Sequence, residues 1–117
     1  MNKYGAQKTV VDGITFASKA EARRYMDLRL LERGREISEL KTQVRYDFIL
    51  NGINIGFYKA DFTYVDCASR KTIVEDVKGM ATPVYRLKKK LMRAMHGITI
   101  QEIGKASAAR DGGRAAA

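Results

Sequence analysis

ADFTYVDCASRKTIVEDVKG, residues 60–79, is the stretch of the chain that decides the fold. Two runs rich in β-branched and aromatic residues flank a polar turn, and this pattern predicts a β-hairpin. Side chains alternate between the two faces of a strand, so Asp76 and Lys78 are expected on one face, opposite Glu75. An acid and a lysine therefore share a face of the second strand.

Turn and capping signals set the bounds of the other expected elements. Ser18 and Glu21 fit a capping box at the start of a helix, and Gly34 offers its stop. Thr82 suits the N-cap of a second helix, which Gly97 would close. The expected elements are a short hairpin over 9–16, a helix over 18–33, a strand over 37–50, two strands on either side of the turn at 66–71, a helix over 83–96 and a strand over 98–103.

The Asn51-Gly52 turn determines the expected register of the long hairpin. With a two-residue loop, Phe48 faces Ile55, and the same apolar row continues to Asp61. A bulge near Gly56 would reverse this assignment. The opposite face is also apolar, so the sheet is expected to be covered on both sides. The expected inward stripe of the second helix consists of Val84, Leu87, Leu91, Ala94 and Met95.

Size and charge limit the class of protein. The chain has 117 residues, with 22 Lys and Arg against 13 Asp and Glu, a net charge of +9. We expect one domain over 1–104, a disordered alanine-rich tail over 105–117 and a polyanionic partner. Cys67 is the single cysteine, which excludes an intrachain disulfide and a thiolate zinc cluster. The sequence contains no apolar run long enough for a membrane span or signal core, so a cytoplasmic location is expected.

The acids of the decisive stretch suit metal-dependent phosphodiester hydrolysis. This reaction needs an activated water and neutralisation of the charge on the phosphate, and divalent metals supply both. Mg²⁺ prefers oxygen ligands and keeps several waters, so Asp61, Asp76 and the backbone carbonyl of Val77 could hold it. Lys78 could orient the water or stabilise the phosphate. Two other interpretations remain open: solvated strand charges, and a simple ion pair between an aspartate and Lys78.

Glu21 is the third candidate acid. Its position on the helical period places it on the core-facing side of the first helix, from which it could reach Asp61. The capping box gives Glu21 a structural reason of its own. The two roles do not exclude each other.

At these residues the chain resembles the PD-(D/E)xK nuclease superfamily, whose core is a helix, three strands, a helix and a fourth strand. Ala60 stands where the name of the motif has proline. More narrowly, the chain is similar to a family of small phage and prophage proteins grouped with that superfamily. The stretches that carry the resemblance are Ser18-Lys19-Ala20-Glu21-Ala22-Arg23-Arg24-Tyr25, Ala60-Asp61-Phe62, Glu75-Asp76-Val77-Lys78-Gly79 and Tyr85-Arg86-Leu87-Lys88-Lys89-Lys90.

The resemblance implies an α/β fold with a restriction-endonuclease-like αβββαβ core, a mixed central sheet flanked by helices, preceded here by a short β-hairpin. It implies catalytic roles for Glu21, Asp61, Asp76 and Lys78, with Mg²⁺, or Mn²⁺ as a substitute, held by the three acids and the Val77 carbonyl. The implied function is a phage-type DNA endonuclease in the cytoplasm of a bacterial host. By analogy with phage Holliday-junction resolvases, a branched DNA substrate and a homodimer are expected.

Basic residues are concentrated on the two helices. A run of lysines most often marks a solvated helix face, but the excess of positive charge favours contacts to nucleic-acid phosphates. The alternative function is a non-catalytic nucleic-acid-binding protein on the same fold. The candidate nucleic-acid-binding residues are Lys19, Arg23, Arg86, Lys88, Lys89, Lys90 and Arg93.

Overall fold

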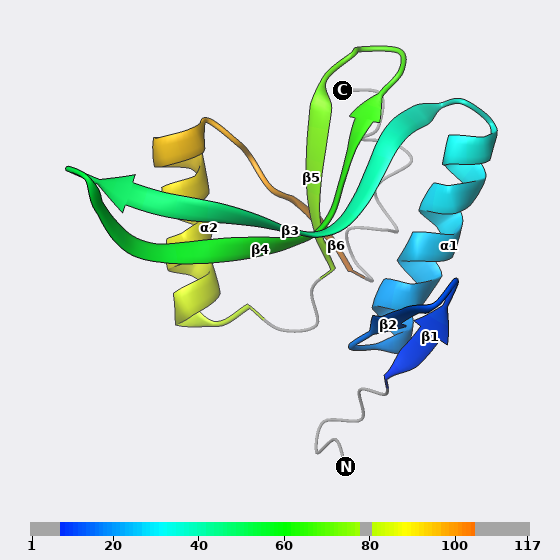
Figure 1. Cartoon of the computed structure of the whole chain (residues 1–117), viewed down its shortest axis with the longest axis horizontal. Coiled ribbons are helices and arrows are strands. Elements are labelled where there is room, and N and C mark those ends of the chain that lie inside the picture. The colour runs from blue at the N-terminus through cyan, green and yellow to red at the C-terminus, as the bar shows by residue number, and fades with distance from the viewer. Residues whose placement is uncertain (1–7, 78–80, 105–117) are drawn as a thin grey trace.

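A computed structural model describes residues 8–77 and 81–104 of the chain (Figure 1). After an N-terminal hairpin, the order of elements is helix, three strands, helix, strand, as the sequence predicts. The predicted tail, 105–117, lies outside the described residues. The elements are β1 (Thr9–Val11), β2 (Ile14–Phe16), α1 (Lys19–Arg33), β3 (Ile37–Leu50), β4 (Ile53–Asp66), β5 (Thr72–Val77), α2 (Pro83–His96) and β6 (Gln101–Ile103).

Four strands form a mixed sheet in the order β3-β4-β5-β6. The pairs β3–β4 and β4–β5 are antiparallel, whereas β6 runs parallel to β5. A parallel pair requires a crossover connection, and α2 provides it. The predicted α/β class with a mixed sheet and an N-terminal hairpin is therefore confirmed. The last strand is shorter than predicted, because only Gln101–Ile103 pairs with β5.

The predicted helix ends are confirmed by their hydrogen bonds. Ser18 Oγ accepts the Glu21 amide at 3.2 Å, and Thr82 Oγ1 accepts the Tyr85 amide at 3.1 Å. Gly97 ends α2 with φ 68°, a left-handed conformation that favours glycine. No helix in the described part of the chain has the length and apolar character needed to span a membrane.

The predicted register of the β3–β4 hairpin is correct at the turn, where Leu50 pairs with Ile53, but wrong beyond it, because the alternative, a bulge at Gly56, is present. Phe48 pairs with Gly56 rather than with Ile55, and the register shifts by one residue toward the turn. The Asn54 side chain accepts the Gly56 amide at 2.9 Å, and Gly56 has φ 149°, so the local backbone departs from the ladder. Both Ile55 and the preceding Ile53 are exposed and form no inward row.

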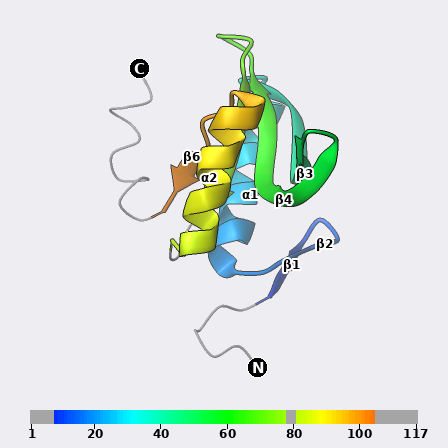
Figure 2. The same ribbon diagram turned by 90° about the vertical axis from the view of Figure 1, so that its left-hand side faces the viewer.

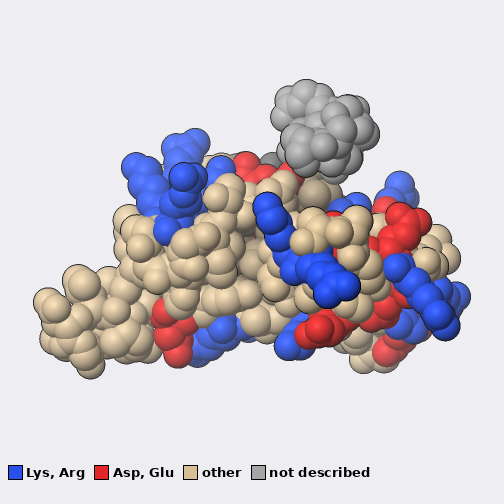
Figure 3. All heavy atoms as spheres, turned by 90° about the horizontal axis from the view of Figure 1, so that it is seen from above, with Lys and Arg blue, Asp and Glu red and all other residues tan. Residues whose placement is uncertain are grey.

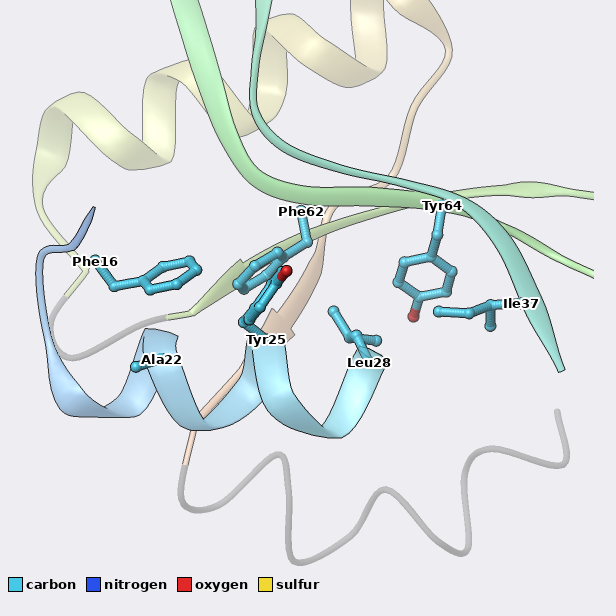
Figure 4. Packing of buried hydrophobic residues seen from close by; sticks show 7 residues of the cluster. All are labelled: Phe16, Ala22, Tyr25, Leu28, Ile37, Phe62 and Tyr64. Atoms are coloured by element: carbon cyan, nitrogen blue, oxygen red, sulfur yellow. The ribbon is translucent and has the colours of Figure 1, made fainter. Parts of the chain in front are cut away.

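Two hydrophobic clusters fill the molecule, one beneath each helix. The first lies between α1 and the sheet, where Tyr25 stacks on Phe62 and the Phe16 ring packs against both at a tilt (Figure 4). The second lies between α2 and the sheet and includes Tyr58 and Met92. Figure 1 shows the two helices at opposite ends of the molecule, with the strands passing between them.

The strand β4 contributes to both clusters and changes face between them. Tyr58 and Ala60 belong to the cluster beneath α2, whereas Phe62 belongs to the cluster beneath α1. Residues two apart on a regular strand share a face, so the strand must rotate at Asp61. Opposite this point on β3, Gln43 has φ 54°, a rare conformation for a residue with a side chain.

The predicted inward stripe of α2 is only partly correct. Leu91 and Met95 are half-buried against the second cluster, but Val84 and Leu87 are 61% and 57% exposed, and Ala94 is also exposed. The fully buried positions are Tyr85 and Met92. The helix is rotated because the buried Tyr58 and Phe48 on the sheet pack against these two larger side chains.

Candidate functional site

A row of polar side chains crosses the sheet at the place where β4 rotates. The register of the parallel pair β5–β6 sets Asp76 beside Glu102. Asp61 directly precedes the paired part of β4, and Asp76 directly follows the matching part of β5, so the two aspartates are neighbours. Gln43 occupies the corresponding position on β3. One row thus contains an amide and three carboxylates from four adjacent strands.

Asp61 is a partly buried acid of this row with a raised pKa. Its Oδ2 accepts the Val77 amide at 2.7 Å. Burial above all, with the negative charges of Glu21 and Asp76, raises the pKa of Asp61 to about 7, against the lowering effect of hydrogen bonds from Val77 and Gln43. The ionised form of this carboxyl is therefore unfavourable in the folded protein, and a nearby positive charge would stabilise it.

Asp76 is buried beside it, with 6% of its surface exposed. The Tyr58 hydroxyl donates to Asp76 Oδ1 at 3.0 Å. Burial, followed by the charge of Asp76 and this hydrogen bond, raises the pKa of Tyr58. The interpretation of Asp76 as a solvated strand charge is wrong, because β5 lies in the interior of the sheet between β4 and β6.

Glu21 joins the two aspartates from the first turn of α1. Its backbone amide caps the helix on Ser18, while its half-buried side chain lies close enough for its charge to raise the pKa of Asp61. The helix cap and the approach to the acids therefore occur together. Three of the four predicted catalytic residues are brought together in space.

The fourth predicted catalytic residue, Lys78, lies outside the described residues, whereas Val77 ends β5. Within residues 8–77 and 81–104, no three His, Cys, Asp or Glu side chains form a ready-made metal cage. The donors that Mg²⁺ prefers are present, however, as neighbouring carboxylates in a partly buried site. Since Mg²⁺ usually keeps several waters and needs one or two carboxylates from the protein, Asp61 and Asp76 fit it, with Glu21 in reach of the same cluster.

The structure adds Glu102 to the site, a residue that the sequence analysis missed. Its Oε2 accepts the Tyr85 hydroxyl at 2.7 Å and lies 3.0 Å from Lys89 Nζ. Burial, then the bond to Glu102, then the charge of Asp76 raise the pKa of Tyr85. The alternation along residues 98–103 was a usable signal, because it puts Glu102 on the same face as the buried Ile100.

A second buried charge cluster lies on the opposite face of β5. Glu75, 1% exposed, receives two hydrogen bonds from Arg24 of α1, at 2.8 and 2.6 Å, and a short one from the Tyr64 hydroxyl. Arg24 is one helical turn beyond Glu21, and Glu75 directly precedes Asp76. The pair therefore ties together the two elements that present the candidate acids.

The basic residues of α2 fall into two groups. Lys88 extends toward β4, where its Nζ lies 5.0 Å from the centre of the Phe57 ring. The others line a groove of about 650 Å³ between α2 and the segment that enters β6. Figure 2 shows β6 on one side of α2 and the β3–β4 hairpin on the other. The groove is lined by Ala81, Tyr85, Arg86, Lys89, Lys90, Arg93, Ala94, Thr99, Ile100 and Glu102.

The two predicted basic residues of α1, Lys19 and Arg23, are exposed and do not line this groove. Figure 3 shows the contrast in charge between the two halves of the molecule. Lys and Arg side chains gather together on the α2 half, whereas acidic and basic side chains alternate over the α1 half. On the face shown, basic side chains are therefore least balanced by acids near α2.

Comparison with known proteins identifies the family of the chain. A family profile described as "Protein of unknown function (DUF1064)" matches residues 1–106, so the chain belongs to this family. Neither the curated proteins nor the solved structures gave a match.

Proposed function

We propose that this DUF1064 protein is a Mg²⁺-dependent endonuclease that hydrolyses phosphodiester bonds in DNA on a restriction-endonuclease-like core. The observation that carries the proposal is the acid cluster of Asp61, Asp76 and Glu21, in which the pKa of Asp61 is raised to about 7. Carboxylates gathered at this density in a partly buried site are stabilised by a divalent cation, which removes their mutual repulsion.

The bound metal would supply an activated water and neutralise charge on the scissile phosphate. Asp61 and Asp76 would hold it, together with Glu21 and the Val77 carbonyl. Tyr58 fixes one oxygen of Asp76, and the Val77 amide fixes one oxygen of Asp61. These hydrogen bonds hold the two carboxylates in place, and carboxylate oxygens can accept hydrogen bonds and also bind a hard cation. We assign Lys78 to the orientation of the water or the stabilisation of the phosphate.

The direct test measures metal-dependent cleavage by the full chain. Plasmid, single-stranded, forked and four-way-junction DNA would be incubated with Mg²⁺, with Mn²⁺ and with chelator. We expect cleavage only with metal, and a loss of about 100-fold or more for Asp61→Asn and Asp76→Asn, since even outer-shell changes at metal sites cost 10–100-fold.

Asp27→Asn is the matched control, because Asp27 is an exposed aspartate on α1 outside the cluster. Its cleavage rate should equal that of the unsubstituted protein. Full activity in Asp76→Asn, or an equal loss in Asp27→Asn, would refute the assignment. Titration with Mn²⁺ by calorimetry, read without DNA, measures the metal site independently of cleavage.

The second candidate function is a non-catalytic nucleic-acid-binding protein. The basic groove beside α2 favours it, because the groove does not depend on the acids for its charge. It predicts salt-sensitive DNA binding with no cleavage of any of the four substrates in either metal.

A homodimer forms part of the proposal, since cutting both strands of a branched DNA takes two active sites. The exposed apolar side chains at the tip of the β3–β4 hairpin support it. Ile53 and Leu50 at the turn are 65% and 53% exposed, and Ile49 and Ile55 are also exposed. Apolar groups gathered on a surface in this way are typical of protein interfaces.

A further inference from the structure

The groove between α2 and β6 combines two kinds of surface. Arg86, Lys89, Lys90 and Arg93 project from successive turns of α2 and form a cationic wall. The other lining residues are mostly apolar or small, among them Ala94 and Ile100. A cationic wall beside an apolar floor matches a ligand with a charged backbone and exposed apolar faces.

We propose that this groove binds an unpaired strand of nucleic acid, with its phosphates on the α2 wall and its bases against the floor. This inference names the part of a branched DNA that the protein holds. It rests on the proposed function, because only that function explains how the bound strand would be cleaved. Electrostatic complementarity supports it, because Arg86, Lys90 and Arg93 form no ion pair within the described part of the chain.

The apolar floor is the feature that favours an unpaired strand over a duplex. A duplex presents phosphates outward and keeps its base faces stacked inside, so it has no group that benefits from an apolar floor. An unpaired strand exposes its bases, and grooves that bind such strands pair a positive track with apolar or aromatic platforms. Tyr85 and Ile100 are both buried, so the platform available to the bases consists of the exposed small residues Ala81, Ala94 and Thr99.

The groove leads directly to the acid row. Tyr85 and Glu102 are among its lining residues, and Glu102 stands beside Asp76 on the adjacent strand. Lys89, a cation of the groove wall, forms an ion pair with Glu102 at 3.0 Å. A strand lying in the groove would therefore continue toward Asp76, with Lys89 as its last cationic contact. The unpaired arm of a branched DNA would reach the acids by this route.

The test measures binding in chelator, so that cleavage plays no part. Fluorescence anisotropy would follow the full chain with labelled oligothymidylate and with a blunt hairpin duplex carrying the same number of phosphates. The double variant Arg86→Gln/Arg93→Gln is compared with Arg33→Gln/Arg35→Gln, which removes two exposed arginines at the far end of α1. Thermal melting shows that each variant is folded.

We expect tighter binding of oligothymidylate than of the duplex. The groove double variant should weaken oligothymidylate binding about tenfold and lower the salt slope by roughly 1.4, the contribution of two phosphate contacts to a single strand. The control double variant should change affinity less than about twofold. Within the groove, Ala94→Glu should weaken binding of the single strand, whereas Leu30→Glu at an exposed site on α1 should not.

Preference for the duplex, equal losses in the two double variants, or displacement of the strand by polyglutamate at matched charge would each overturn this inference. The last result would assign the groove to an acidic peptide. If the groove variants bind oligothymidylate normally and the unsubstituted protein cleaves DNA, only the inference about the groove is refuted. If the groove variants lose oligothymidylate binding as expected but the unsubstituted protein cleaves no DNA with either metal, only the proposed function is refuted.

Discussion

At the scale of single residues, Asp61 has the widest effect on the site. Its carboxylate accepts the Val77 amide in place of a backbone carbonyl of the neighbouring strand. This bond lies where the buried face of β4 changes from the α2 cluster to the α1 cluster. Burial and two neighbouring acids raise its pKa to about 7. Its charge therefore opposes the folded state unless a cation is bound.

Asp61 gives the protein a pH-dependent stability. Because its pKa is higher in the folded than in the unfolded chain, the folded state binds the additional proton between about pH 4 and 7. Stability from this group is fully present below about pH 4 and is lost as pH rises to about 7. In chelator, urea denaturation should show Asp61→Asn gaining about 1 kcal/mol or more relative to the unsubstituted protein over this window. An equal pH profile for the two proteins would contradict the assignment, and Mg²⁺ should reduce the difference.

Tyr58 should matter through one hydroxyl. Tyr58→Phe removes the donor to a buried carboxylate, and hydrogen bonds to charged groups contribute about 1.5–3 kcal/mol. We expect a loss of that size in the free energy of unfolding at pH 7, measured in urea. Tyr46→Phe is the control. Tyr46 pairs with Tyr58 on the adjacent strand, and the Tyr46 hydroxyl makes no hydrogen bond within the described residues. Equal losses in the two variants would mean that the hydroxyl to Asp76 contributes nothing specific.

The sequence was sufficient to predict Asp61, Asp76 and Glu21 as neighbours, because hairpin pairing and helical period are local rules. It was not sufficient for Glu102. That residue becomes part of the site through the parallel pairing of β6 with β5, which depends on the packing of the α2 crossover. Lys78 remains a prediction, since it lies outside the described residues.

At the scale of elements, the Arg24–Glu75 pair joins α1 to β5. The two hydrogen bonds of the guanidinium fix orientation as well as distance, which a lysine cannot do. Because Glu21 and Asp76 lie on these same two elements, the pair sets the distance between the candidate acids. Arg24 and Glu75 are positioning residues in the proposed reaction.

Removing one partner of this pair should be costly. Arg24→Met leaves Glu75 buried without its cation, and we expect a loss of about 2–4 kcal/mol in urea denaturation. Arg24→Met/Glu75→Gln should lose less than Arg24→Met alone. Arg24→Lys should recover most of the stability and less of the Mn²⁺ affinity, because the charge returns without the paired geometry. If Mn²⁺ affinity recovers fully in the lysine variant, a positioning role is excluded.

The errors in predicting the elements have a common cause. Helix caps and turns follow from a few adjacent residues, and those predictions are confirmed. The bulge at Gly56 and the rotation of α2 depend on which face packs best across the sheet, where Tyr85 and Met92 prevail over Val84 and Leu87. The sequence period alone does not rank these faces.

At the scale of the whole molecule, the tip of the β3–β4 hairpin projects as an uncharged surface (Figure 3). If the protein dimerises through it, Ile53→Lys/Ile55→Lys should shift the sedimentation coefficient from dimer to monomer at working concentration. Leu30→Lys, an equally exposed apolar site on α1, should leave it unchanged. A monomer at every concentration of the unsubstituted protein would remove the dimer from the proposal.

The two separate hydrophobic clusters have a consequence for local unfolding. The acid row lies at their boundary: Glu21 approaches it from the α1 half, and Tyr58 and Tyr85 donate to it from the α2 half. Proteins open in cooperative units of unequal stability, and a boundary site exists only while both neighbouring units are closed. The fraction of molecules with an intact site is therefore set by the weaker half, and the Val77 amide, bonded to Asp61, would report that opening in hydrogen exchange.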